Sequence, residues 1–260
     1  NNPDFKEGDL VIGHLPFQQV VAVQKSDIPK WHVTRLENPL GIDIRHFLGI
    51  LGMPGLTAYS SLYEICKPKK GETIFVSAAS GAVGQTVGLL AKHEGLKVIG
   101  SVGSDAKLDY IVKELGFDGG FNYKKEKPAD ALKRLAPEGI DIYYENVGGE
   151  QLEAAIGAMK HHGRIAVCGM ISQYNKPMDQ HYPIRNLWEV LNRRLTLRGF
   201  ITGDPEYQAY SKEHQQRVQK WLKEGTIKEK IWEIQGIDKA VEGFLALFTG
   251  ENFGKAMLKY

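Results

Sequence analysis

Six short apolar segments, each followed by a stretch of helical character, occupy the chain between residues 73 and 202. The expected strands are residues 73–78, 97–102, 119–123, 140–146, 164–169 and 195–202. Consecutive parallel strands need a crossover connection, usually a helix, so this alternation is typical of βαβ units. We therefore predict an α/β fold whose centre is a doubly wound parallel sheet.

The segment at the first strand-to-helix junction is rich in small residues. It reads SAASGAVGQTVG and ends at Gly88, with a helix expected over residues 83–93. Ala78, Gly81 and Gly84 then lie in the turn and the first helical turn, where a pyrophosphate can approach the backbone and the helix N-terminus. Glycines at such junctions also serve packing alone, and the six-strand context is what favours dinucleotide binding.

The tip of the second strand indicates which dinucleotide is bound. NAD sites carry an acidic residue about 20 positions beyond the glycines, and here that count from Gly84 reaches Ser104. Asp105 is better placed in the first turn of the next helix, with Ser104 as its cap. Lys107 can turn its ammonium toward a 2′-phosphate, although a solvated helix charge is the alternative. The sequence favours NADP over NAD.

Composition excludes several classes of function. The 33 basic and 31 acidic residues are scattered and give a net charge of +2, so we expect no nucleic-acid partner. The uncharged residues 73–91 are diluted by Gly and Ser, so we expect no membrane helix. Two distant cysteines, Cys66 and Cys168, suit the reducing cytoplasm. The chain opens without Met or a signal-like segment, and we expect it to start within a longer protein.

The two ends of the chain have a different character. Residues 9–13 and 18–23 are β-like runs that suggest an antiparallel module. Beyond residue 203 we expect an amphipathic helix through Trp221, a strand at 230–234, a helix at 237–248 and a strand at 255–260. We expect this tail to rejoin the N-terminal module.

Several motifs together resemble the zinc-independent medium-chain dehydrogenases/reductases, and within them the alkenal (one double-bond) reductases and prostaglandin reductases. The motifs are LGMPGLTAY, SAASGAVGQTVG, GSDAK, GFDGGFNYK, ENVGGE, GRIAVCGMISQYN and GENFGK, which run in this order from residue 51 to 255. The resemblance implies a Rossmann domain at 51–203 and a GroES-like, mainly β substrate domain. Residues 1–50 would be an incomplete part of that domain, which residues 204–260 rejoin.

The resemblance also implies which residues bind NADPH. The phosphate contacts would be made by Gly81, Ala82, Val83 and Gly84, and the 2′-phosphate would contact Lys107 with Gly103 and Tyr123 nearby. Asn146 would face the ribose and nicotinamide, which Met53 and Thr57 would border. Further implied contacts are Cys168, Gly169, Met170, Ile171, Ser172, Gln173, Tyr174, Phe200, Ile201, Thr202 and Asn252.

Two departures from the family pattern concern the substrate. The family's opening strands and a substrate-facing Tyr have no counterpart before Asn1. In the helix before LTLRGF, where the animal prostaglandin reductases and some plant relatives place a Tyr at the substrate carbonyl, this chain has Asn192. An amide donates a hydrogen bond but does not pass a proton. We therefore expect Asn192 to contact the substrate without acting as an acid.

The implied reaction is hydride transfer from NADPH to the β-carbon of an α,β-unsaturated ketone or aldehyde. Charge would build on the carbonyl oxygen, and solvent would protonate the α-carbon. The alternatives are an NADPH quinone oxidoreductase of the same superfamily and a non-catalytic NADPH-binding protein. The family often pairs its Rossmann sheets through the last strand, here near residues 195–202, so we expect a homodimer.

Two other dehydrogenase classes fit the sequence less well. A zinc alcohol dehydrogenase often carries a four-cysteine structural site, which two cysteines cannot build, and we expect no metal. The adjacent His161 and His162 are expected in a surface turn. A short-chain dehydrogenase needs Tyr-x-x-x-Lys well after the glycine loop, whereas Tyr63 and Lys67 precede it.

Overall fold

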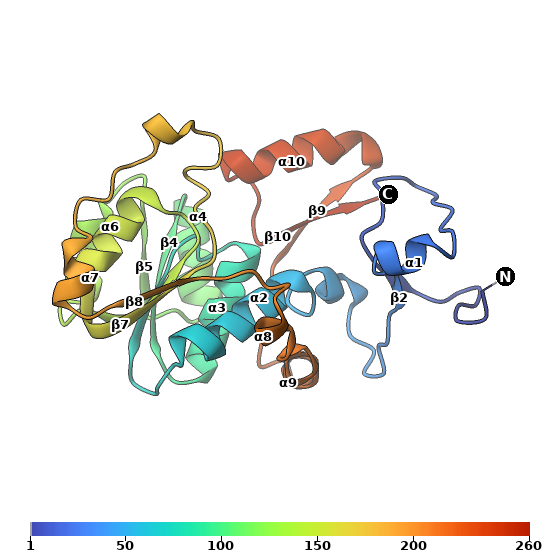
Figure 1. Ribbon diagram of the computed structural model, residues 1–260, viewed down its shortest axis with the longest axis horizontal. Coiled ribbons are helices and arrows are strands. Elements are labelled where there is room, and N and C mark those ends of the chain that lie inside the picture. Colours follow the sequence, from blue (N-terminus) through green and yellow to red (C-terminus); the bar gives the residue numbers. More distant parts are fainter. Residues whose placement is uncertain (1) are drawn as a thin grey trace.

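A six-stranded parallel sheet forms the centre of the computed structural model, which describes residues 2–260 (Figure 1). The strand order is β5-β4-β3-β6-β7-β8, the order of a Rossmann sheet, which confirms the predicted fold class. The strands are β3 (Thr73–Val76), β4 (Lys97–Val102), β5 (Gly119–Asn122), β6 (Ile140–Glu145), β7 (Met159–Val167) and β8 (Thr196–Gly199). The order reverses between β3 and β6, so their carboxyl ends form the switch point of the sheet.

Alternate side chains of the central strands enter two separate cores. Ile74, Val76 and Tyr144 pack beneath α2 (Met53–Ser61) and α3 (Ala82–His93). Phe75 and Tyr143 are stacked in the other core, with side chains of α5 (Pro128–Leu135) and α6 (Gly149–Ala158). Both faces of the sheet are therefore buried, which explains why the strands are continuous apolar runs.

Two expected strands of the sheet are shorter than their apolar runs. The segment expected at 73–78 ends at Val76, and Ala78 has a positive φ of 49°, which breaks the extended backbone. The segment expected at 195–202 pairs only over Thr196–Gly199, because its neighbour β7 ends opposite Gly199.

Strand β7 begins five residues before the expected start at residue 164. Its register against β6 shifts after Met159, and His162 there has a φ of 63°. His161 and His162 are both exposed in this irregular stretch of the strand, rather than in a separate turn.

The N-terminal part of the chain contains little regular structure. Strand β1 (Val11–Ile12) pairs antiparallel with β2 (Thr34–Arg35). The strand expected at residues 18–23 is wrong, because that segment forms no ladder and Val20 is 86% exposed. The other elements are α1 (Asp27–Lys30) and the 3₁₀ helix η1 (Ile44–Leu48).

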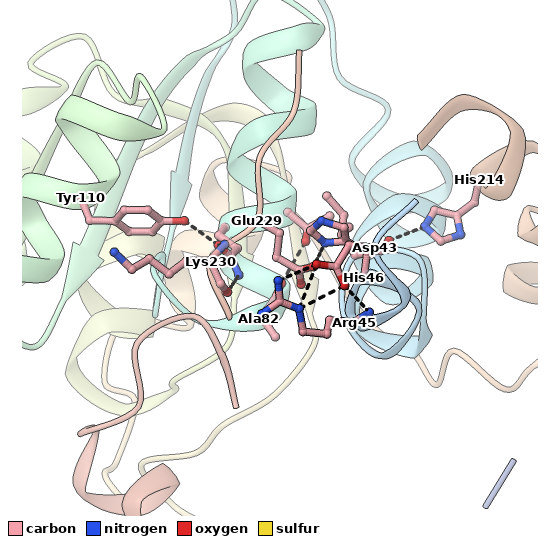
Figure 2. A network of polar contacts seen from close by, with 11 residues as sticks. Asp43, Arg45, His46, Ala82, Tyr110, His214, Glu229 and Lys230 are labelled. Atoms are coloured by element: carbon pink, nitrogen blue, oxygen red, sulfur yellow. Dashed lines mark hydrogen bonds and ion pairs between the residues drawn. The ribbon is translucent and has the colours of Figure 1, made fainter. Parts of the chain in front are cut away.

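The C-terminal segment packs on both α2 and the N-terminal part. Tyr59 of α2 donates a 2.7 Å hydrogen bond to Glu213, and His214 contacts the Ile50 carbonyl at 2.9 Å. His46 faces the buried Glu229 at 2.9 Å (Figure 2). The elements involved are α8 (Pro205–Gln208), α9 (Ser211–Glu224), η5 (Ile237–Lys239), α10 (Ala240–Thr249) and the parallel pair β9 (Ile231–Gln235) and β10 (Lys255–Lys259).

Short helices make the remaining connections. Two are π-helical turns that continue α2 and α4, and two lead toward β8. They are η2 (Leu62–Cys66), α4 (Asp105–Asp109), η3 (Tyr110–Glu114), η4 (Met178–Gln180) and α7 (Trp188–Asn192).

Candidate active site

The glycine turn between β3 and α3 leaves a helix N-terminus open. Gly81 is the N-cap of α3, and no side chain caps the helix. A Cβ on Gly84 would lie 2.3 Å from the Ala78 carbonyl oxygen, so only glycine permits this turn. A Cβ on Gly88 would lie 1.9 Å from the Phe117 ring, which explains the close packing of α3 there. The first N–H groups of a 12-residue helix therefore face the carboxyl ends of the strands.

Asn146 joins the two strands at the switch point. Its backbone N–H donates to the Ser77 hydroxyl at 2.9 Å, and its side-chain amide donates to the Ser77 carbonyl at 2.7 Å. Its own carbonyl accepts a hydrogen bond from Ile171 at 3.3 Å. The predicted ribose-side residue thus lies at the carboxyl end of β6, where open α/β sheets bind ligands.

Glu145 is a fully buried carboxyl group directly before Asn146. Its Oε1 accepts hydrogen bonds from Gly148 N–H at 2.8 Å, Tyr143 hydroxyl at 2.9 Å and Ser77 hydroxyl at 3.2 Å. Its Oε2 is buried and has no hydrogen-bond partner among the residues described. Burial raises the pKa of Glu145, while its hydrogen-bond donors oppose that shift.

The tip of β4 forms a basic corner. Ser104 caps α4 by accepting from Lys107 N–H at 3.3 Å, as predicted. Asp105 is held by the Asn122 amide at 2.9 Å, so its carboxylate is already engaged. Burial lowers the pKa of Lys107, and the nearby Lys124 lowers it further. Two cations at one strand tip suit a phosphate dianion.

The Lys107 ammonium already donates one hydrogen bond within the chain. Its Nζ donates a 2.6 Å hydrogen bond to the carbonyl of Gly250, the C-cap of α10. An ammonium has three donors, so two of them stay available to a phosphate. Gly103 and Tyr123 lie at the same corner, since a Cβ on Gly103 would be 3.0 Å from the Tyr123 hydroxyl.

The residues after α10 run beside the glycine turn. Gly254 forms a β-bridge with Gly81, and the Asn252 amide donates to the Gly254 carbonyl at 3.2 Å. Tyr110 and Lys230 fix this arrangement, because the Tyr110 hydroxyl and the Lys230 N–H both donate to the Gln85 side chain of α3. The Lys230 ammonium lies 5.2 Å from the centre of the Tyr110 ring (Figure 2). The C-terminal segment therefore forms one wall of the glycine turn.

A second wall follows β7. The N–H groups of Cys168 and Gly169 donate to the Glu145 carbonyl, and the Ser172 hydroxyl donates to the Val147 carbonyl at 2.6 Å. Burial raises the pKa of the Cys168 thiol to about 11, so it is neutral near pH 7. The other predicted residues of this loop are Met170, Ile171, Gln173 and Tyr174, of which Gln173 is buried and Tyr174 is exposed.

A hydroxyl pair links α2 to the end of β8. Thr57 Oγ1 and Thr202 Oγ1 are 2.7 Å apart, and Thr57 also donates to the Met53 carbonyl at 2.7 Å. The side chains of Met53 and Ile201 are 69% and 70% exposed beside them, while Phe200 packs into the core. The structure thus places Thr57, predicted with Met53 to border the nicotinamide, in contact with Thr202, predicted to contact the cofactor.

Asn192 does not join this group within one chain. It ends α7 before β8 begins, and it lines a cavity of about 940 Å³ with Gly139 and His161. These residues lie at the amino ends of the strands. The stretch from Leu195 to Thr202 spans roughly 23 Å at strand rise, so a single chain cannot bring Asn192 to its own Thr202. The expected substrate contact of Asn192 is therefore not made within one chain.

Glu145, Ser77 and Lys124 are the residues that sequence reasoning missed. Glu145 and Ser77 stand next to predicted positions, and Lys124 ends the GFDGGFNYK motif. A carboxylate or hydroxyl inside an apolar strand is a usable signal, because buried polar groups need partners. The identity of those partners was not readable from the sequence.

Within residues 2–260, no group of three or more His, Cys, Asp or Glu side chains is arranged to hold a metal ion. No helix in the same part of the chain is both long and apolar enough to cross a membrane.

Tyr63 and Lys67, which match the Tyr-x-x-x-Lys pattern of short-chain dehydrogenases, have other partners or places. The Tyr63 hydroxyl donates to Glu94 at 2.5 Å, and Lys67 ends the π-helical turn η2 with a positive φ of 46°.

The strand order, the open N-terminus of α3 and the polar switch point define a dinucleotide-binding α/β protein of the Rossmann type. Residues 82–218 match the family model described as zinc-binding dehydrogenase. The chain belongs to this family of medium-chain dehydrogenases/reductases, which confirms the resemblance read from the motifs.

Named relatives cover nearly the whole chain. The chain is 53% identical to NADP-dependent oxidoreductase RED1 of Cochliobolus heterostrophus, over 97% of this chain and 71% of the relative. It is 42% identical to the 2-alkenal reductase (NADP(+)-dependent) of Nicotiana tabacum, over 99% and 73%. The crystal structure of CurA in complex with NADPH from Vibrio vulnificus superimposes with a TM-score of 0.82 and 36% identity, covering 87% of this chain and 68% of CurA.

Proposed function

We propose that this protein is an NADPH-dependent reductase that saturates the carbon-carbon double bond of α,β-unsaturated ketones or aldehydes. The observation that carries the cofactor part of the proposal is the uncapped N-terminus of α3 together with Lys107, which follow the carboxyl ends of the neighbouring parallel strands β3 and β4. The 2-alkenal reductase of Nicotiana tabacum and the NADPH-bound CurA structure support this substrate class and this cofactor.

The residues present fit NADPH. The backbone N–H groups from Gly81 to Gly84 suit the pyrophosphate, since no side chain caps that helix end by a hydrogen bond. Lys107 and Lys124 suit the 2′-phosphate, whose negative charge would relieve the repulsion between the two ammonium groups. Asn146 and the Thr57–Thr202 pair offer amide and hydroxyl groups on the nicotinamide side.

When bound, NADPH supplies the hydride that reaches the β-carbon of the substrate. The chain holds the reacting partners and stabilises the charge that develops on the carbonyl oxygen. Met53 and Ile201 provide exposed apolar surface beside the Thr57–Thr202 pair, which suits the hydrocarbon part of an alkenal. Solvent suffices to protonate the α-carbon, so the reaction needs no side-chain acid.

The decisive test is turnover of the purified protein with a 2-alkenal, an enone and a quinone, each with NADPH and with NADH. We expect NADPH oxidation with the alkenal or the enone and a saturated carbonyl product. Turnover of the quinone alone would assign the protein to the quinone reductase branch. Tight NADPH binding without any turnover would identify a non-catalytic binding protein.

The domain boundaries, the oligomer and the location complete the proposal. We propose a Rossmann domain at residues 51–203 and a substrate domain built from 1–50 and 204–260, supported by the His46–Glu229 contact.

We propose a homodimer that pairs through the edge strand β8. We also propose a cytoplasmic location, because both cysteines are free, as reducing conditions favour.

A further inference from the structure

The Glu145 carboxyl group lies at the centre of a buried hydrogen-bond network at the switch point of the sheet. Besides the Gly148 N–H and the two hydroxyl groups described above, its Oε1 accepts the Val147 N–H at 2.5 Å. Both backbone donors belong to the turn that leads into α6, where Gly148 and Gly149 have positive φ values of 77° and 61°. A side-chain oxygen that accepts from consecutive N–H groups fixes the backbone of such a turn.

The Ser77 hydroxyl connects this network to Asn146. It lies 3.2 Å from Glu145 Oε1 and accepts the Asn146 backbone N–H at 2.9 Å. The Tyr143 hydroxyl is within hydrogen-bond distance of both partners, at 2.9 Å from Glu145 Oε1 and 3.1 Å from Ser77 Oγ. Glu145, Ser77 and Tyr143 are fully buried, so these hydrogen bonds form away from water, where they are stronger. The position of Asn146 therefore depends on a carboxyl group that solvent does not reach.

The side-chain amide of Asn146 has a defined orientation. The Ser77 carbonyl oxygen only accepts hydrogen bonds, so the amide atom 2.7 Å from it is the donor Nδ2. The amide oxygen Oδ1 lies on the other side of the amide group. It accepts no hydrogen bond from the residues described, and it is not among the polar atoms that are buried without a partner. Asn146 therefore presents an accessible hydrogen-bond acceptor at the carboxyl end of β6.

The strand order indicates which half of NADPH reaches this acceptor. Lys107 follows β4 and the uncapped N-terminus of α3 follows β3, whereas Asn146 follows β6 on the other side of β3. A dinucleotide with its 2′-phosphate at β4 and its pyrophosphate at β3 extends its other half over β6. That half is the nicotinamide riboside, whose hydroxyl and carboxamide groups are hydrogen-bond donors and match an amide oxygen.

We propose that Glu145 and Ser77 are positioning residues, which hold Asn146 so that its amide oxygen accepts a hydrogen bond from the nicotinamide riboside half of NADPH. This inference rests on the proposed function for its cofactor, but binding alone tests it. The two positioning side chains are fully buried and act through Asn146. Their loss should therefore weaken the binding of one half of the cofactor, whereas a general loss of structure would weaken the binding of both halves.

Ser77→Ala is the decisive variant. It removes the hydroxyl between Glu145 and Asn146 and leaves the carboxyl group with its two backbone donors. By calorimetry we expect the NADPH dissociation constant to rise about fivefold, the effect of one hydrogen bond, and that of adenosine 2′,5′-bisphosphate to stay within about twofold. The second ligand carries the 2′-phosphate and lacks the nicotinamide half. Equal weakening of both ligands would overturn the proposal.

Ser101→Ala is the matched control. Ser101 is also fully buried, in β4, and its hydroxyl donates to Gln151 Oε1 at 2.5 Å. The variant loses one buried hydrogen bond, as Ser77→Ala does, but that bond involves neither Glu145 nor Asn146. We expect its affinity for both ligands to stay within about twofold of wild type. An NADPH defect as large as that of Ser77→Ala would contradict a specific role for Ser77.

A double-mutant cycle tests whether Ser77 acts through Asn146. Asn146→Ala removes the acceptor and should weaken NADPH binding about fivefold, with little effect on adenosine 2′,5′-bisphosphate. Adding Ser77→Ala to it should cause little further loss, as expected of residues in one hydrogen-bond network. Fully additive losses, or wild-type NADPH affinity in Asn146→Ala, would refute positioning through this amide.

Glu145→Gln tests the carboxyl group itself and separates the two proposals. The variant keeps an oxygen at Oε1, so we expect its NADPH affinity to stay within about threefold of wild type. A folded Glu145→Gln protein that has lost its NADPH affinity would contradict the role given to Oε1. Wild-type protein and variants that show the expected binding pattern but reduce no enone or alkenal would refute the proposed function and leave the positioning of Asn146 standing.

Discussion

The amino ends and the carboxyl ends of the strands, called here the amino edge and the carboxyl edge of the central sheet, both carry charged residues, but these residues have different partners. At the amino edge, where the strands begin, the charged side chains form ion pairs with one another. Arg164 forms a bidentate ion pair with Glu72 at 2.7 and 2.9 Å, and Lys160 forms one with Asp141 at 2.9 Å. At the carboxyl edge, the Glu145 carboxyl group forms no ion pair with the residues that the structure describes, and one of its oxygens has no partner among them. The α3 N-terminus there also lacks a cap.

This difference shows which edge binds a ligand. Satisfied ion pairs tie the strand starts to the loops and add stability only. The uncapped N–H groups of α3 cost stability until a ligand accepts hydrogen bonds from them, and the buried Glu145 oxygen without a partner costs stability as well. Substitutions at the carboxyl edge should therefore change NADPH binding and stability together, and those at the amino edge should change stability alone.

The largest effect is expected for Glu145→Ala. The substitution removes the acceptor of the Gly148 N–H and of the Tyr143 and Ser77 hydroxyls, and each buried donor left unsatisfied costs about 1–3 kcal/mol. We expect a stability loss of several kcal/mol in urea unfolding and a large loss of NADPH affinity by calorimetry. Glu145→Gln keeps an oxygen at Oε1 and should recover most of both. Wild-type NADPH affinity in Glu145→Ala would contradict this view of the carboxyl edge.

Arg164→Ala is the counterpart at the amino edge. Its guanidinium also donates to the Cys66 carbonyl at 2.8 Å, so its loss should lower the free energy of unfolding by about 2 kcal/mol. The NADPH dissociation constant should stay within twofold of wild type, because no contact of Arg164 reaches the carboxyl edge. A weakened cofactor affinity measured on the folded variant would break the proposed division between the edges.

Lys107→Gln is expected to change cofactor choice with a smaller effect on stability. Loss of a charged donor to the 2′-phosphate should reduce kcat/KM for NADPH about 10- to 100-fold and leave kcat/KM for NADH nearly unchanged. Burial and Lys124 lower the pKa of Lys107, so its ammonium deprotonates at lower pH than an ordinary lysine. Wild-type kcat/KM for NADPH should therefore fall as the pH rises, and the fall should be absent in the variant. A pH profile shared by both proteins would argue against this contact.

The smallest effect is expected for Thr202→Val. The variant keeps the side-chain shape and loses the 2.7 Å hydrogen bond to Thr57, which is worth about 1 kcal/mol. We expect a fall of about 2–4 °C in melting temperature and, because the pair borders the proposed nicotinamide site, a loss of about fivefold in kcat/KM for the enone. Thr202→Ser retains the hydroxyl and should behave like wild type. Equal defects in both variants would mean that shape, not the hydroxyl, matters at this position.

The local parts of the site were predictable because short-range patterns carry them. The glycine turn, the Ser104 cap and the strand of each βα unit follow from residues that are close in sequence. The N-terminal prediction at residues 18–23 failed because an apolar run forms a strand only where a neighbouring strand is available to pair with it.

Contacts between distant residues were not predictable from one sequence. Thr57 and Thr202 are 145 positions apart, and Lys107 and Gly250 are 143 positions apart. Each of these two hydrogen bonds depends on how the helices pack on the sheet. Asn192 was expected at the substrate, and the structure shows that a single chain holds it at the opposite edge.

The sequence by itself determined the parallel sheet, the open turn before α3 and the family, because strand alternation, small residues at a turn and ordered motifs are local properties. The tertiary structure alone decided which buried oxygen of Glu145 stays unpartnered, which carbonyl Lys107 holds and on which edge Asn192 lies. Those facts depend on how segments that are distant in the sequence pack together, because the packed fold determines which of their side chains come into contact.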